Sequence, residues 1–204
     1  LVAQVNEGSA RFHGELFDAA KEALSSGKKL VTLGGDHSVS FGPIKAHLEK
    51  HPGLSVLHID AHADLRAAYC GFPHSHASIF HLVSGLEGFG SLVQVGLRDV
   101  SPGEMEFGKE NGVHQFFDWD LRRATARGVP WAEQCRRILE PLGQEIYLSV
   151  DIDGLDPKYC PSTGTPVPGG LELWELFYLL EEVERSGRRF VGADLVEVGS
   201  GDYD

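Results

Sequence analysis

Cysteine is scarce in this 204-residue chain, and it has neither a long apolar run nor an excess of basic residues. Its three cysteines, Cys70, Cys135 and Cys160, are widely spaced and form no CxxC pair, which argues against a disulfide framework or a thiolate zinc site. No apolar run approaches the roughly 20 residues that a membrane-spanning helix needs. We therefore expect a cytoplasmic protein that does not enter a membrane.

Basic residues are outnumbered, with 18 Lys and Arg against 30 Asp and Glu, so the formal net charge is -12. Proteins that bind nucleic acid usually carry a basic surface, so we expect no nucleic-acid partner. The length allows one domain with a sizeable core. Because the chain starts at Leu1 without Met and stops at Asp204 just after a strand-like run, we expect one domain over 1–204 that is incomplete at both ends.

Short apolar runs alternate with helical patterns along the chain. The predicted strands are 29–35, 54–60, 91–97, 145–153 and 189–198. The predicted helices are 9–27, capped by Ser9 and stopped by Gly27, then 101–112 with a Ser101–Glu104 capping box, 131–143 and 171–187. Strands that are apolar on both faces and separated by helices predict an α/β fold with a mainly parallel sheet.

Potential ligands follow four of the five predicted strands. His37 follows the first strand, Asp60 ends the second, Asp151 and Asp153 end the fourth, and Glu197 lies near the end of the fifth. In open parallel α/β sheets, ligands bind beyond the carboxyl ends of the strands. The sequence therefore predicts that these side chains meet at one edge of the sheet.

The segment "HIDAHADLR" has the strongest ligand pattern. In an extended chain Asp60, His62 and Asp64 point to one side. Taken singly, a His beside an Asp is typical of a hydrogen-bonded surface pair, and His37 is typical of a helix start. Buried charge without a partner is costly, however, and the joint arrangement favours a bound cation.

The chemistry of these ligands indicates which metal binds. The predicted set holds two imidazoles and four carboxylates, namely His37, Asp60, His62, Asp64, Asp151 and Asp153. Hard oxygen ligands with some nitrogen suit manganese better than structural zinc. One divalent ion offsets two of the four negative charges, whereas two Mn²⁺ ions balance all four. Paired ions can also activate a shared water, which predicts a hydrolase.

The segments "GGDHS", "DAHAD", "SVDIDGLDP" with "TGTP", and "DLVEV" resemble, in order from residue 34 to 198, the signature motifs of the ureohydrolase family. This family includes arginase and agmatinase. The resemblance implies a three-layer α/β/α fold, a binuclear manganese site, and cleavage of a small guanidinium substrate with release of urea. It also implies a homo-oligomer, as a trimer or a hexamer.

The same resemblance assigns roles to the candidate residues. His37 and Asp64 are the expected terminal ligands of one ion, His62 and Asp153 those of the other, with Asp60 and Asp151 as bridges. Asp64 is also expected to carry a proton to the departing amine. His76, in Ser75-His76-Ala77, matches a proton-shuttling or substrate-contacting histidine, Thr165 lies near the guanidinium, and Glu197 holds it. His74 and His81 are expected to be bystanders.

Arg66 indicates which guanidine is the substrate. It stands where arginases carry an Asn, and "LRAAYCGFP" is more similar to the loop of agmatinases. We therefore expect hydrolysis of agmatine to putrescine and urea. Arg66 could instead bind the acidic tail of another guanidine, or pair with a neighbouring subunit, which we favour. Arginase, guanidinobutyrase and formimidoylglutamase activities stay open, and less so a binuclear phosphoesterase or an inactive binding member of the family.

Overall fold

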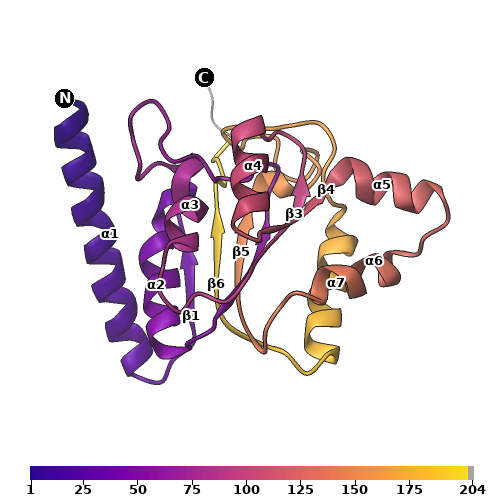
Figure 1. Cartoon of the computed structure of the whole chain (residues 1–204), viewed down its shortest axis with the longest axis horizontal. Helices are drawn as coiled ribbons and strands as arrows, with labels where there is room; N and C mark the ends of the chain where they lie inside the picture. The colour runs from indigo at the N-terminus through magenta and orange to yellow at the C-terminus, as the bar shows by residue number, and fades with distance from the viewer. Residues whose placement is uncertain (202–204) are drawn as a thin grey trace.

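The computed structural model describes residues 1–201 and is built around a six-stranded parallel sheet (Figure 1). The strand order is β1-β6-β5-β2-β3-β4. The strands are β1 (Leu30–Leu33), β2 (Ser55–Ile59), β3 (Leu92–Leu97), β4 (His114–Phe117), β5 (Glu145–Asp151) and β6 (Arg189–Val196). All five predicted strands are confirmed, and the neighbouring strands all pair in parallel.

Helices cover both faces of this sheet, as Figure 1 shows. The helices are α1 (Val2–Ser25), α2 (Phe41–Lys50), α3 (Ile79–Ser84), α4 (Pro102–Glu110), α5 (Asp118–Ala126), α6 (Trp131–Leu139) and α7 (Leu173–Arg185). Three single turns of 3-10 helix lie at strand ends or in loops, namely η1 (His37–Ser40), η2 (His76–Ser78) and η3 (Ile152–Gly154). The predicted three-layer α/β/α architecture is therefore confirmed.

Two hydrophobic clusters hold the layers together. Ile59 of β2 packs in one cluster with Ile138 of α6 and Leu179 of α7. Val56 of β2 packs in the other with Ile44 of α2. Every residue of β2 and β3 is buried, because central parallel strands are covered on both faces. The centre of the sheet is thus a rigid base for the ligand-bearing loop after β2.

The helix boundaries bring one correction and two confirmations. Helix α1 begins at Val2, so Ser9 lies inside it and is not its cap. Gly27, with φ 77°, follows the end of this helix as predicted. The capping box of Ser101 and Glu104 at the start of α4 is also present. Among residues 1–201, no helix is both long and apolar enough to span a membrane.

Candidate active site

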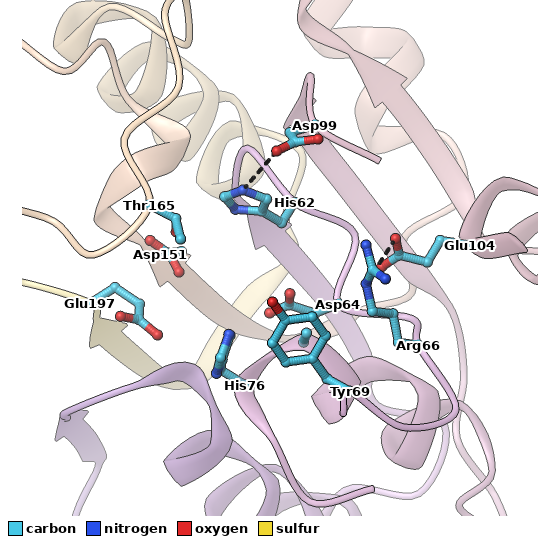
Figure 2. Close-up of a pocket in the computed structure, with 11 residues that line it drawn as sticks. His62, Asp64, Arg66, Tyr69, His76, Asp99, Glu104, Asp151, Thr165 and Glu197 are labelled. Atoms are coloured by element: carbon cyan, nitrogen blue, oxygen red, sulfur yellow. Dashed lines mark ion pairs between the residues drawn. The ribbon is translucent and has the colours of Figure 1, made fainter. Parts of the chain in front are cut away.

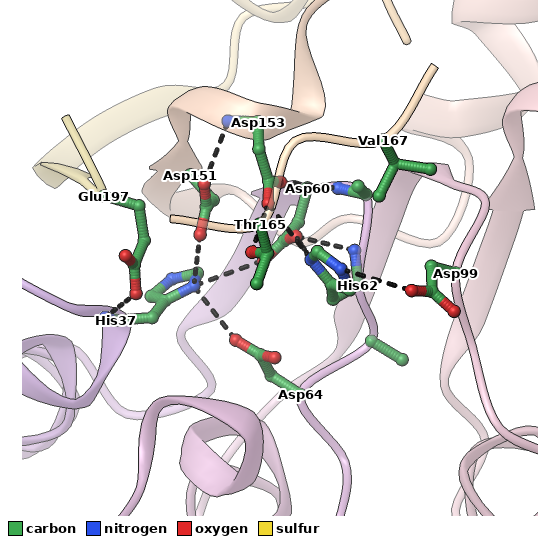
Figure 3. A network of polar contacts seen from close by, with 12 residues as sticks. His37, Asp60, His62, Asp64, Asp99, Asp151, Asp153, Thr165, Val167 and Glu197 are labelled. Carbon is green, nitrogen blue, oxygen red and sulfur yellow. Dashed lines mark hydrogen bonds and ion pairs between the residues drawn. The ribbon is translucent and has the colours of Figure 1, made fainter. Parts of the chain in front are cut away.

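The predicted ligands converge at the carboxyl edge of the sheet (Figure 3). His37 begins η1 after β1, Asp60 comes directly after β2, and Asp151 ends β5. Donor atoms lie within 4.8 Å of one another in two groups, one of His37, His58, Asp60 and Asp64 and the other of Asp60, His62 and Asp153. Asp60 belongs to both groups, so it lies between two potential metal positions.

Close backbone packing brings the β5 ligands to the end of β2. A Cβ on Gly154 would lie 2.6 Å from the backbone nitrogen of Asp60. Any larger residue would therefore push η3 away from the end of β2. Asp153, one position earlier, accepts a hydrogen bond from the Ala61 backbone N–H at 3.1 Å. Gly154 thus allows the two aspartate-bearing segments to meet.

His37 has one ring nitrogen that fits a cation. Its Nδ1 lies 3.1 Å from Asp64 Oδ2, 3.2 Å from Asp60 Oδ2 and 3.6 Å from Asp151 Oδ2. Within residues 1–201 this buried Nδ1 has no hydrogen-bond partner. Burial opposes a charge on the ring, yet Asp60 and Asp64 raise the pKa of His37 well above its usual value. A proton or a metal ion must therefore lie between Nδ1 and these carboxylates.

The other ring nitrogen of His37 is anchored by a buried chain. Nε2 lies 2.9 Å from Ser149 Oγ, and Ser149 donates its hydroxyl proton to Asp194 Oδ1 at 2.7 Å. Because that proton is already committed, the serine oxygen accepts from Nε2–H. A neutral His37 then keeps its Nδ1 lone pair free, as a metal-binding imidazole requires.

His62 occupies the corresponding position on the second group. Its Nδ1 lies 3.1 Å from Asp153 Oδ2 and 3.4 Å from Asp60 Oδ1. These two carboxylates outweigh the effect of burial and raise the pKa of His62 to about 11. The His62 side chain is 22% exposed, whereas that of His37 is 1% exposed. The second group is therefore nearer to solvent.

The four carboxylates are too close to be ionised together without a cation. Burial, with the charge of Asp60, raises the pKa of Asp151 to about 10 and that of Asp64 to about 7. Burial would also raise the pKa of Asp60, but His58, His37 and His62 hold it well below its usual value. The residues therefore fit a pair of divalent ions, which would replace these protons.

Two of the candidate residues have a strained backbone. Of residues 1–201, three non-glycine residues have positive φ: Asp64 at 53°, Cys70 at 52° and Glu197 at 61°. This conformation costs about 1–3 kcal/mol and persists only where neighbouring contacts enforce it. Phe80 N–H donates to Asp64 O at 3.0 Å, and Glu197 N–H donates to Gly35 O at 2.9 Å. Such strain is often found at functional sites.

A pocket opens over the candidate metal ligands, and Figure 2 shows that side chains of several loops line it. Its lining residues are His62, Asp64, Arg66, Tyr69, His76, Ala77, Asp99, Glu104, Asp151, Thr165 and Glu197. Glu197 Oε1 accepts from the His37 backbone N–H at 3.0 Å, and Thr165 Oγ1 donates to Asp153 Oδ2 at 3.1 Å. The structure thus brings together every candidate residue that the sequence indicated.

Other pocket residues were missed or left open by the sequence. Arg66 Nε lies 3.6 Å from Glu104 Oε2, and its guanidinium carbon lies 5.5 Å from the ring centre of Tyr69. These contacts are within the chain, and the expected pairing with a neighbouring subunit stays a prediction. No motif marks Tyr69 or Asp99, and Glu104 was marked only as part of the capping box of α4. His74 is not among the residues that line this pocket, and its Nδ1 lies 3.2 Å from His13 Nδ1. His58, also missed, carried one available signal, since it lies two residues before Asp60 in "HIDAHAD".

The fold and the site define an α/β protein with two groups of candidate metal ligands at the carboxyl edge of its sheet. A family model described as the arginase family matches residues 3–203, and the chain belongs to this family. It is 42% identical over 186 residues to an N(1)-aminopropylagmatine ureohydrolase of Thermus thermophilus. The matched segment covers 91% of this chain and 60% of that protein. An agmatinase of Bacillus subtilis is 38% identical over 86% of this chain and 57% of its own length.

The fold comparison agrees with the sequence comparison. The crystal structure of arginase from Bacillus subtilis superposes with a TM-score of 0.82 at 26% identity, covering 96% of this chain and 71% of that one. A putative agmatinase structure from Clostridium difficile gives a TM-score of 0.77 at 28% identity, over 94% of this chain and 66% of that one. The chain spans about 60% of the length of the curated ureohydrolase and agmatinase that it matches.

Proposed function

We propose that this protein hydrolyses an amine-tailed guanidine, most simply agmatine to putrescine and urea, with two Mn²⁺ ions. The observation that carries the proposal is Asp60, which is shared by two His/Asp groups on the floor of a pocket that Glu197 also lines. His37 and Asp64 would hold one ion, His62 and Asp153 the other, and Asp60 and Asp151 would bridge them. Bound manganese would supply a water nucleophile that is activated near neutral pH.

The pocket residues would handle the substrate and its protons. Glu197 would bind the planar guanidinium through paired charged hydrogen bonds. Asp64 would take the proton of the attacking water and deliver it to the departing amine. His76 would exchange that proton with solvent or contact the substrate. Thr165 would steady Asp153 through its hydrogen bond and lie near the guanidinium.

Charge at the pocket mouth supports an amine tail over a carboxylate tail. Asp99 is 71% exposed and carries a negative charge beside His62. Arg66, the cation that an acidic tail would need, already faces Glu104 at 3.6 Å. The names of the two curated relatives, N(1)-aminopropylagmatine ureohydrolase and agmatinase, point the same way. Other ureohydrolase substrates remain the second candidate, whereas the Glu197 carboxylate would repel a phosphoester.

Urea release from a set of guanidines tests this proposal. The set holds agmatine, N(1)-aminopropylagmatine, arginine, 4-guanidinobutyrate and formiminoglutamate, with p-nitrophenyl phosphate as control. We expect activity to vanish after chelation, to return best with Mn²⁺, and to be highest on the amine-tailed guanidines. Equal activity of metal-free and manganese-loaded protein would end the two-ion hypothesis. A homotrimer or hexamer and a cytoplasmic location belong to the same proposal, and light scattering tests the assembly.

A further inference from the structure

His58 is a buried histidine that the proposed reaction does not use. It lies on β2 with 0% exposure, and its ring centre is 4.0 Å from that of Phe80. Its Nε2 lies 2.7 Å from Asp60 Oδ2. By distance alone His58 belongs to the group with His37, Asp60 and Asp64, so it could be taken for another metal ligand.

Gln94, a buried residue on β3, shows whether His58 is a metal ligand or a hydrogen-bond donor to Asp60. Gln94 Nε2 lies 2.6 Å from the Ala63 carbonyl oxygen, which can only accept, so the NH₂ end of the amide must face it. The same nitrogen lies 3.0 Å from His58 Nδ1. Gln94 Oε1 accepts from Gln115 Nε2 at 3.1 Å, which supports this orientation. The network therefore assigns Nδ1 of His58 as an acceptor.

The tautomer of His58 is fixed by that assignment. A neutral imidazole has one donor nitrogen and one acceptor nitrogen. Since Nδ1 accepts from Gln94, Nε2 carries the proton and donates it to Asp60. A nitrogen that bears a proton cannot bind a metal ion.

The hydrogen bonds on Asp60 suit a bridging carboxylate. Oδ2 accepts from His58 Nε2 at 2.7 Å, and Oδ1 accepts from the His62 backbone N–H at 2.6 Å. Each carboxylate oxygen has two lone pairs. One lone pair on each oxygen is therefore occupied by an N–H group, which leaves one on each for a metal ion.

We propose that His58 is a positioning residue that orients the bridging carboxylate of Asp60 and is not itself a metal ligand. In this arrangement Gln94 holds His58 in the Nε2–H tautomer, and His58 holds Asp60 so that one free lone pair faces each ion. The inference rests on the proposed two-ion site. It adds a relay, Gln115 to Gln94 to His58 to Asp60, that runs across three neighbouring strands from β4 to the end of β2.

Nitrogen-15 NMR of the metal-free, histidine-labelled protein tests the tautomer without any reaction. Long-range proton–nitrogen correlations report which ring nitrogen bears the proton. We expect a proton on His58 Nε2 and none on Nδ1, and a loss of that preference in Gln94→Glu, whose carboxylate cannot donate. A proton on Nδ1 of the wild-type protein would overturn the proposal.

Manganese titration by calorimetry, with electron paramagnetic resonance of the coupled ion pair, tests the positioning role. Loss of a partner that orients a ligand typically costs 10–100-fold in metal affinity, and we expect this for His58→Phe and Gln94→Glu. His58→Gln places an amide N–H near the Nε2 position, so it should restore most of the affinity and the coupled signal. Unchanged affinity in His58→Phe, or failure of His58→Gln to rescue, would contradict the role.

His47 provides a matched control. It is also a fully buried histidine, but it lies on α2, and its Nδ1 bonds to the Pro43 carbonyl at 2.7 Å. His47→Phe should lower the melting temperature as His58→Phe does and leave manganese affinity unchanged. An equal loss of affinity in both variants would reduce the role of His58 to general packing. If the wild-type protein bound no ion, the proposed function would fail while the NMR result still decided the tautomer.

Discussion

The floor and the rim of the pocket differ in how firmly they are held. The floor is defined as the six proposed metal ligands: His62, Asp64 and Asp151, which line the pocket, and His37, Asp60 and Asp153, which contact them. Its side chains are almost fully buried, apart from His62 at 22% exposure. The rim consists of Arg66, Tyr69 and Asp99, which are 44%, 42% and 71% exposed. Buried, paired charge is expensive to disturb, whereas exposed pairs contribute about 0–1 kcal/mol.

Asp151→Asn should have the largest effect, because a bridging ligand holds both ions. Removing one member of a buried charged group costs about 3–5 kcal/mol, so both ions should leave and activity should fall to background. Asp153→Asn should lose one ion and retain the other. Metal content by mass spectrometry checks this order. Two ions retained in Asp151→Asn would contradict the bridging role.

His76→Asn should lower turnover about 10²–10⁴-fold, the usual contribution of a general acid or base, with normal metal content. His74→Asn is the matched control, since His74 contacts His13 instead of the pocket. Turnover and manganese content should be measured on both variants. If His74 were the critical residue, the assignment of this loop would be off by two positions.

Glu197→Gln keeps the shape of the side chain and removes its charge. Truncation of one partner of a buried charged pair costs about 2–5 kcal/mol, so kcat/KM for agmatine should fall by roughly 30-fold to 4,000-fold. Both manganese ions should remain bound. Binding of putrescine, which has no guanidinium, should change less. A near wild-type kcat/KM of Glu197→Gln on agmatine would show that Glu197 does not bind the guanidinium.

Arg66→Ala should have the smallest effect, because its pair with Glu104 is long and half exposed. We expect kcat/KM for agmatine to change less than about fivefold, in line with 0–1 kcal/mol for an exposed pair. The ratio of activities on agmatine and 4-guanidinobutyrate is the sharper measurement. A selective loss of 4-guanidinobutyrate hydrolysis would show that Arg66 binds an acidic tail and that the rim takes part in substrate recognition.

The elements that sequence patterns missed have weak local signals. Strand β4 is four residues long, lies at the sheet edge and begins with an exposed His114, so it lacks an apolar run. Helix α2 begins with Gly42 and Pro43 in its first turn, which are typical of a turn. In the fold these two are buried, and the missing side chain of Gly42 lets α2 approach the backbone of Phe17 in α1.

The sequence by itself determined five of the six strands and the ligand types at their ends, because alternation along a strand and the shared edge of parallel strands are consequences of local geometry. Only the tertiary structure decided that His58 donates to Asp60 under the control of Gln94, that Arg66 faces Glu104, and that His74 turns to His13. The His58–Gln94 and His13–His74 contacts join positions 36 and 61 residues apart in the chain. Such contacts depend on how helices and loops pack over the sheet, and no local pattern specifies that packing.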